Sequence, residues 1–276
     1  MQSLFKQLNV PVVLLSSLLL ILIIVPAYIL SGIFLEEKTV EPFMENMSDF
    51  ERGEYYFSSD HYDLSQARYY YESSIKNDPQ SNPLQWYQLA RINFLEAEFD
   101  TAIHNLDKQR EYFGDTVPNV HYMYGLVYGF RADMYKRPQD FELAEKHFLQ
   151  FLEYMPDSPW GRIDLSWIYF SQREFDNMLL ALDPVYDQEQ DNPWFLNMYG
   201  LAAMNTGEPE MAVKYMTRAV ALSSEVQVAD WADVYPGNSP TDWEVGLVEF
   251  GQALKLNLAL AEKKVEVGGD SVQTQD

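Results

Sequence analysis

The chain has 276 residues, of which 47% are hydrophobic, so it is long enough to bury a sizeable core. Its 42 aspartates and glutamates outweigh its 19 lysines and arginines, and the formal net charge of −23 argues against nucleic acid and anionic lipid headgroups as partners. It contains no cysteine, which excludes disulfide bonds, thiolate nucleophiles and cysteine-ligated metal sites.

The first predicted element is a membrane-spanning helix over residues 12–35. No Asp, Glu, Lys, Arg or His lies between Lys6 and Glu36, and a helix of this length spans about 36 Å, enough to cross a bilayer. A cleaved secretory signal is the alternative, but its apolar core is shorter and it ends in a small-x-small site, which residues 29–31 fit poorly. We therefore expect an uncleaved signal anchor, preceded by a short cytoplasmic N-terminus at residues 1–11.

The charges that flank this segment predict its orientation. Lys6 and the amino terminus precede it, whereas Glu36 and Glu37 follow it with Lys38 to offset them. Positive charge favours the cytoplasmic side, so the N-terminus is expected in the cytoplasm and the rest of the chain outside it. That compartment is the periplasm if the source is a bacterium with two membranes. A linker over residues 36–46 would keep the remaining residues near the membrane surface.

Residues 47–224 repeat one helical pattern about every 34 residues. Each unit has an anchor position, usually alanine, followed four positions later by a large apolar residue. The anchors are Ala67, Ala102, Ala144, Met178 and Ala212, and the large residues are Tyr71, Leu106, Phe148, Leu182 and Met216. A further small residue lies about twelve positions before most anchors, which lets two antiparallel helices approach closely. The pattern predicts five stacked helical hairpins.

The third unit is longer than the others. Gly125 precedes its anchor Ala144 by nineteen positions, whereas Gly200 precedes Ala212 by twelve. The simplest interpretation puts the seven extra residues in the turn near residues 135–138.

These motifs resemble the tetratricopeptide repeat. The family pattern Trp-x2-Leu-Gly-x2-Tyr, then Ala-x3-Phe and Pro, is echoed by Trp86 and Leu89 in one unit and by Gly125, Tyr128, Ala144, Phe148 and Pro156 in another. The resemblance implies an all-α, right-handed superhelical array of about five helical hairpins. It also implies a protein that binds other proteins, because the family is defined by packing and its members bind unrelated partners.

The C-terminal region departs from the repeat. Residues 225–240 contain a Pro-Gly-Asn turn signal and are expected to form a loop. A helix over residues 241–267 would follow, with an apolar stripe that includes Leu254 and Ala261 and with paired glycines after its end. We expect this helix to cap the last hairpin and residues 268–276 to form a disordered tail.

The sequence predicts no enzymatic activity, cofactor, metal site or small-molecule substrate. Its four histidines are spread along the chain without ligand spacing: His61, His104, His121 and His147. It has no glycine-rich phosphate loop, no Gly-x-Ser-x-Gly elbow and no His-Glu-x-x-His motif.

The resemblance also implies where a partner would bind. In this family the first helix of each hairpin lines a concave groove, through positions three before and one and four after its small residue. That rule selects Tyr87, Arg91, Phe94, Tyr122, Leu126, Gly129, Ile163, Trp167, Phe170, Asn197, Leu201 and Met204, with Trp160 and Trp194 one turn earlier on the same stripe. Aromatic residues at this spacing fit packing between helices equally well, so both interpretations stay open.

The leading functional hypothesis is a membrane-anchored adaptor or scaffold that binds a peptide segment or a protein face outside the cytoplasm. Such a protein would serve the assembly or maturation of an envelope or exported complex. The acidic charge fits a partner with a basic segment, or it simply keeps the array soluble. The alternative hypothesis is a fixed structural subunit that its membrane helix holds in a complex.

Overall fold

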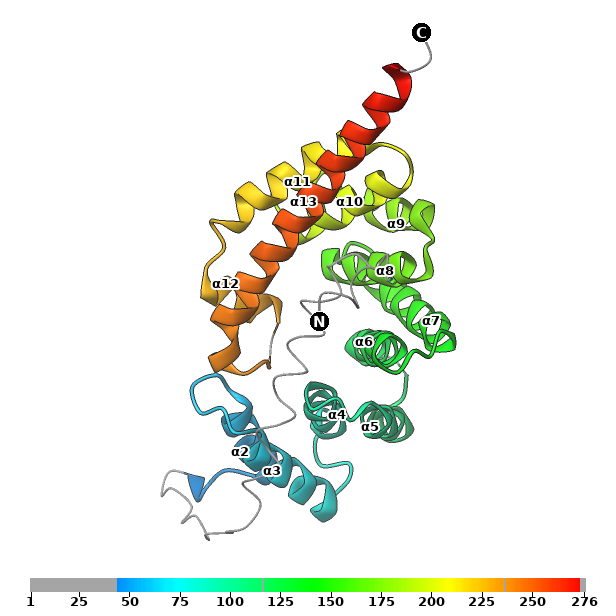
Figure 1. The fold of residues 1–276 in the computed structure, drawn as a ribbon. Helices are drawn as coiled ribbons and strands as arrows, with labels where there is room; N and C mark the ends of the chain where they lie inside the picture. The colour runs from blue at the N-terminus through cyan, green and yellow to red at the C-terminus, as the bar shows by residue number, and fades with distance from the viewer. Residues whose placement is uncertain (1–43, 116, 236, 274–276) are drawn as a thin grey trace. The chain divides into compact units, whose positions relative to one another are not determined.

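The structure of the protein is a computed structural model that describes residues 44–115, 117–235 and 237–273. In this part of the chain every regular element is helical (Figure 1). The elements are α2 (Asp49–Phe57), α3 (Leu64–Asn77), α4 (Gln85–Leu95), α5 (Phe99–Phe113), α6 (Pro118–Tyr135), α7 (Gln139–Tyr154), α8 (Pro159–Gln172), α9 (Phe175–Leu182), η3 (Asp183–Val185), α10 (Pro193–Asn205), α11 (Pro209–Ser223), α12 (Val228–Val234), η4 (Pro240–Asp242) and α13 (Trp243–Gln273).

The expected signal anchor at residues 12–35 lies outside the described residues, as does most of the linker. Of the helices that are described, none combines the length and the apolar character that crossing a membrane requires.

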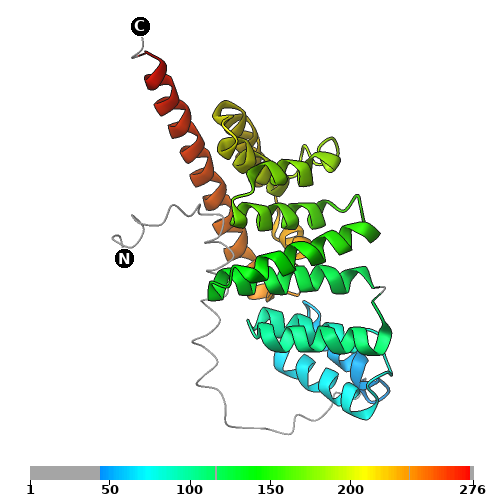
Figure 2. The same cartoon turned by 90° about the vertical axis from the view of Figure 1, so that its right-hand side faces the viewer.

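The helices divide into two compact units, within which consecutive helices form antiparallel hairpins (Figure 2). The N-terminal unit comprises residues 44–156 and 232–243 and contains the hairpins α2–α3, α4–α5 and α6–α7. The C-terminal unit comprises residues 157–231 and 244–273 and contains α8–α9, α10–α11 and most of α13. The five hairpins match the five predicted repeats, which confirms an all-α helical array.

Small residues let the two helices of a hairpin approach closely. A Cβ built on Gly125 of α6 would lie 2.8 Å from the Phe148 ring of α7, and one built on Gly200 of α10 would lie 2.8 Å from Cγ of Met216 in α11. In both hairpins the glycine faces the large residue that follows the anchor by four positions. The small and large residues whose spacing defined the repeat in the sequence therefore contact one another across these hairpins and hold their two helices together.

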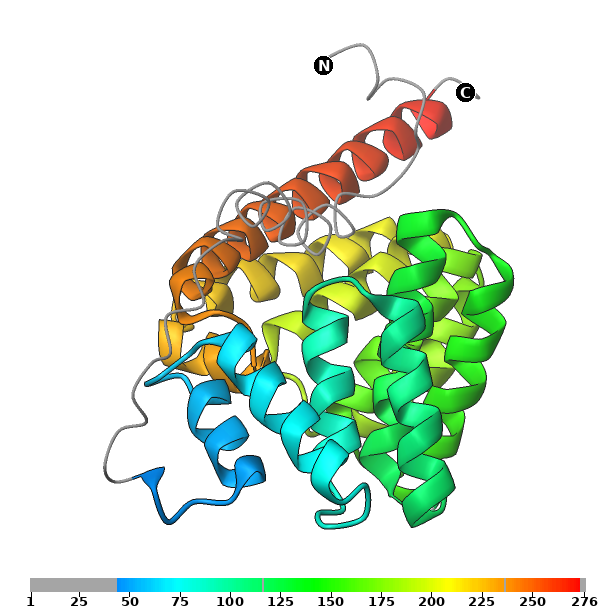
Figure 3. The ribbon, with the colours of Figure 1, turned by 90° about the horizontal axis from the view of Figure 1, so that it is seen from below.

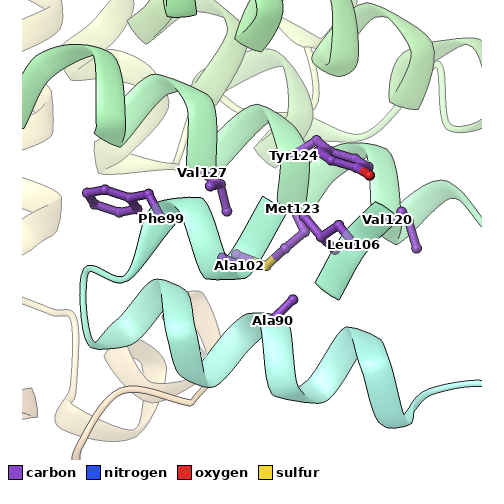
Figure 4. Packing of buried hydrophobic residues seen from close by; sticks show 8 residues of the cluster. All are labelled: Ala90, Phe99, Ala102, Leu106, Val120, Met123, Tyr124 and Val127. Carbon is purple, nitrogen blue, oxygen red and sulfur yellow. The ribbon is translucent and has the colours of Figure 1, made fainter. Parts of the chain in front are cut away.

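The core of the N-terminal unit is built from the same positions. Ala90 of α4 and Ala102 of α5 face one another and are fully buried, with Leu106 and Met123 beside them (Figure 4). Burying a side chain the size of leucine or methionine contributes about 1.5–3 kcal/mol. The small residues set the distance between the helices, and the large ones supply the buried apolar area.

The extra residues of the third repeat lie in its helices, so the expectation of a longer turn at residues 135–138 was wrong. The turn between α6 and α7 has three residues, 136–138, the same number as the turn at residues 96–98. The additional length falls mainly at the end of α6, which has 18 residues, against 11 in α4. Arg131 stabilises this extension by a bidentate ion pair with the buried carboxylate of Asp140 in α7.

The C-terminal region is more helical than expected. The expected loop at residues 225–240 contains α12, and its Trp231 is buried. The expected helix at residues 241–267 is longer, because α13 continues through Gly268 and Gly269 to Gln273, over most of the tail expected at residues 268–276. Glycine inside a helix costs about 1 kcal/mol relative to alanine, which does not by itself end a long helix.

Candidate protein-binding surface

The predicted groove residues all lie on the first helices of their hairpins. They come from α4 (Tyr87, Arg91, Phe94), α6 (Tyr122, Leu126, Gly129), α8 (Trp160, Ile163, Trp167, Phe170) and α10 (Trp194, Asn197, Leu201, Met204). Six of the fourteen are buried: Gly129, Ile163, Phe170, Asn197, Leu201 and Met204. The other eight are half-buried. Six predicted groove residues therefore lie beneath the surface, and eight combine packing with partial exposure.

In the N-terminal unit the half-buried residues border the core. Tyr87, Phe94 and Leu126 pack against the cluster that contains Ala90 and Ala102. Burial raises the pKa of the Tyr87 phenol, so this hydroxyl stays protonated at neutral pH. Each of these side chains has one face on the core and part of its surface in solvent, which suits an apolar contact with a partner.

Tyr122 of α6 extends the same surface. Its ring meets the Phe148 ring edge-on at 5.7 Å and the Phe151 ring at 5.1 Å, both on α7. These contacts fix the position of the Tyr122 ring, and part of the side chain remains exposed. A rigid aromatic side chain of this kind loses little conformational entropy when it meets a partner.

Arg91 is covered by the chain itself. Its guanidinium lies 4.7 Å from the centre of the Phe57 ring and donates to Gln88 Oε1 at 2.8 Å. A Cβ built on Gly237 would lie 2.9 Å from Nη2 of Arg91, and the hydroxyl of Tyr62 donates to the Gly237 carbonyl at 2.8 Å. The segment around Gly237 thus lies over this part of α4, so Arg91 packs within its own unit.

In the C-terminal unit the long helix α13, in orange and red in Figure 3, lies over the preceding helices. Its side chains contact predicted groove residues of α10. The ring of Phe250 stacks on Trp194 with centroids 4.6 Å apart and planes 10° apart. Nδ2 of Asn257 donates to Oδ1 of Asn197 at 3.0 Å. The sequence predicted a helix here as a cap on the last hairpin, and the structure adds that it covers the groove residues of α10. Phe250 and Asn257, spaced by seven residues, mark the contacting face of α13, but this spacing does not reveal which face it meets.

We use the name open groove residues for six half-buried members of the predicted set, leaving out Arg91 and Trp194, which contact the Gly237 segment and α13. They are Tyr87, Phe94, Tyr122 and Leu126 in the N-terminal unit and Trp160 and Trp167 in the C-terminal unit. Each also packs within its own unit, as Trp160 does against Trp194, with ring centroids 5.9 Å apart.

Two of the histidines meet, although the sequence offered no sign of it. Nδ1 of His121 in α6 lies 3.3 Å from Nδ1 of His147 in α7, and the His147 ring stacks on Tyr124 at 4.5 Å. Burial lowers the pKa of His147 to about 4, and the nearby His121 adds to this effect. Within the described residues, no three histidine, aspartate or glutamate side chains are placed to hold a metal ion. The contacts of His147 with His121 and Tyr124 pack α6 against α7.

Comparison with known proteins bears on the fold. Residues 195–225, which span α10 and α11, match the model of the tetratricopeptide repeat. No curated protein matches the chain.

Several solved structures share the fold at low sequence identity. The crystal structure of PilW, described as a widely conserved type IV pilus biogenesis factor, is 17% identical with a TM-score of 0.53, over 79% of this chain and 96% of that one. MamA is 20% identical with a TM-score of 0.51, over 63% and 95% of the two chains. YrrB, described as a TPR protein with an unusual peptide-binding site, is 14% identical with a TM-score of 0.51, over 67% and 89%.

Proposed function

We propose that this chain, whose fold is a tetratricopeptide-repeat array, is a membrane-anchored scaffold that binds a protein partner outside the cytoplasm through its open groove residues. The partner is a peptide segment or a protein face, and the binding serves the assembly or maturation of an envelope or exported complex.

One observation carries this proposal. Aromatic side chains from the first helices of three different hairpins stay half-exposed after each unit has built its core: Tyr87 and Phe94 on α4, Tyr122 on α6, and Trp160 and Trp167 on α8. An aromatic anchor that a partner buries is worth about 2 kcal/mol or more in binding free energy. The resemblance to the tetratricopeptide repeat implies that this side of the helices is used for recognition, and YrrB is described as having an unusual peptide-binding site.

The membrane anchor and the location rest on the sequence. The apolar segment at residues 12–35 is long enough to span a bilayer, and its flanking charges favour a cytoplasmic N-terminus. The net charge of −23 favours a partner with a basic segment. An assembly role is consistent with the similarity in fold to PilW, a type IV pilus biogenesis factor.

Site-specific photocrosslinking tests the proposal. Benzoylphenylalanine would replace Tyr122 of α6 or Trp167 of α8 in the full chain, and the crosslinked products would be identified after membrane solubilisation. Matched controls would carry the same probe at Tyr69 of α3 or Leu180 of α9, which are 62% and 68% exposed. We expect the same protein at both groove positions and at neither control. Equal crosslinking from all four positions would overturn the proposal.

A fixed structural subunit is the second candidate. The packing of α13 on α10 favours it, because Trp194 and Asn197 already contact α13 in place of a partner. Replacing residues 12–35 with an unrelated apolar helix separates the two functions. A scaffold that binds through its groove keeps its partner after this exchange, whereas a subunit held through its membrane helix leaves the complex.

A further inference from the structure

Helix α13 makes three polar or aromatic contacts with α10, in the same order along both helices. Phe250 stacks on Trp194, Asn257 donates to Asn197, and Nζ of Lys264 donates to the backbone carbonyl of Met204 at 2.7 Å. The two helices therefore run parallel in the C-terminal unit. Phe250, Asn257 and Lys264 are spaced by seven residues, so they lie on one face of α13.

The α10 partners are residues that the repeat pattern assigns to the groove. Trp194, Asn197 and Met204 are three of the four predicted groove positions of this hairpin, and the fourth is the buried Leu201. On α13, Leu254 and Ala261 are buried on the same face as the three contacts, with exposed fractions of 1% and 0%. The face of α13 that meets α10 is thus an apolar stripe with one amide at its centre, as in amphipathic helices that bind in grooves.

The face of α13 that meets α10 also contains a polar group that is poorly satisfied. Within the described part of the chain, Oδ1 of Asn257 is buried without a hydrogen-bond partner. Buried polar groups of this kind weaken packing but fix the position at which a helix docks. By contrast, Val248 of α13 is 54% exposed.

We infer that α13 is an intramolecular ligand that occupies the groove of the α10–α11 hairpin, and that an external amphipathic helix with the same spacing replaces it. The external helix would run parallel to α10. It would present an aromatic residue to Trp194, an asparagine seven residues later to Asn197, and a lysine seven residues after that to the C-terminal end of α10. This inference rests on the proposed function in one respect, namely that the groove face binds protein.

A peptide with the sequence of residues 243–267 is the probe. Fluorescein-labelled peptide would be titrated against the full chain in detergent micelles, with fluorescence anisotropy as the readout. In the Phe250→Ala chain, α13 loses its stacking on Trp194 and the groove is open for a larger fraction of the time. We expect this chain to bind the peptide about tenfold more tightly than the wild type, because apparent affinity scales with the fraction of binding-competent molecules. The Val248→Ala chain is the matched control and should behave as the wild type.

Changes in the peptide test the pattern without affecting the fold of the protein. Peptides with Phe250→Ala or Asn257→Leu should bind the Phe250→Ala chain at least about tenfold more weakly than the native peptide, since each lacks one contact with α10. The peptide with Val248→Ala should bind as the native peptide does. Circular dichroism would check that each chain has wild-type helicity.

Two results would overturn the inference: equal binding of the peptide to the Phe250→Ala and Val248→Ala chains, or equal binding of all three altered peptides. Either result would leave crosslinks from Tyr122 and Trp167 unaffected, because those residues lie on α6 and α8. Conversely, peptide binding without specific crosslinks would support the inference and count against the proposed function, so the two can fail separately.

Discussion

Gly125 of α6 lies so close to the Phe148 ring of α7 that a Cβ on the glycine would be 2.8 Å from three of its atoms. The Phe148 side chain is fully buried and cannot move aside without disturbing the core. Overpacking of this kind costs about 1–3 kcal/mol, whereas replacing a helical glycine by alanine gains about 1 kcal/mol.

The net of these two effects is a loss of up to about 2 kcal/mol, so we expect Gly125→Ala to lower the free energy of unfolding by about 1 kcal/mol. Urea denaturation in detergent micelles, followed by circular dichroism, measures this change. Gly251→Ala in α13 is the matched control, because a Cβ there meets nothing within 4 Å and should stabilise the chain slightly. Stabilisation by both substitutions would contradict the close packing of α6 on α7.

Arg131 and Asp140 provide a second test. The Arg131 guanidinium donates from Nε and Nη2 to both oxygens of Asp140, which is 3% exposed. Arg131→Met would leave a buried carboxylate without its partner, so we expect a loss of about 3 kcal/mol or more in the free energy of unfolding. Asp100→Asn, which removes the other ion pair of Arg131 at a side chain that is 74% exposed, should cost less than about 1 kcal/mol. Similar losses in the two variants would contradict the assignment.

The pH dependence of stability tests the buried histidine pair. The pKa of His147 is about 4 in the folded state, because burial and His121, Arg110 and Lys146 disfavour its charged form, while Asp115 acts in the opposite sense. In the unfolded state its pKa is near 6.5, so between these values the unfolded chain binds a proton that the folded chain does not.

Acidification from pH 6.5 to 4 should therefore destabilise the fold, and above pH 6.5 this residue should add no pH dependence. The contribution is at most about 3 kcal/mol. His147→Gln should remove it, so the difference in unfolding free energy between wild type and variant should change with pH in this window alone. A constant difference from pH 4 to 7 would contradict a low pKa for His147.

The repeat architecture could be predicted because its cause is local and periodic. The small residue, the anchor and the large residue, which are Gly200, Ala212 and Met216 in the fifth repeat, have equivalents at similar spacing in the other repeats. They recur because each hairpin needs the same close contact between its helices. The position of the third repeat's extra residues could not be predicted, because a longer helix and a longer turn give the same spacing between Gly125 and Ala144.

The contents of the groove depend on contacts between distant parts of the sequence. The repeat pattern placed Trp194 and Asn197 on the correct face of α10, but it carried no information on which segment would cover them. His121 and His147 likewise meet because α6 and α7 are antiparallel, and their separation in the sequence does not reveal this. Sequence patterns thus predicted the faces of helices, whereas the structure was needed to pair those faces with other segments.

Partner capture by alanine variants tests the central claim most directly. The amount of partner that co-purifies with the full chain from solubilised membranes would be compared for wild type, Trp167→Ala and Leu180→Ala. The three membrane preparations would be made in parallel under identical conditions. Trp167 is a half-buried groove residue of α8, and Leu180 is an exposed residue of α9. The account predicts that Trp167→Ala lowers the yield of partner about tenfold or more while Leu180→Ala leaves it unchanged. Wild-type yield from Trp167→Ala, at wild-type helicity, would contradict it.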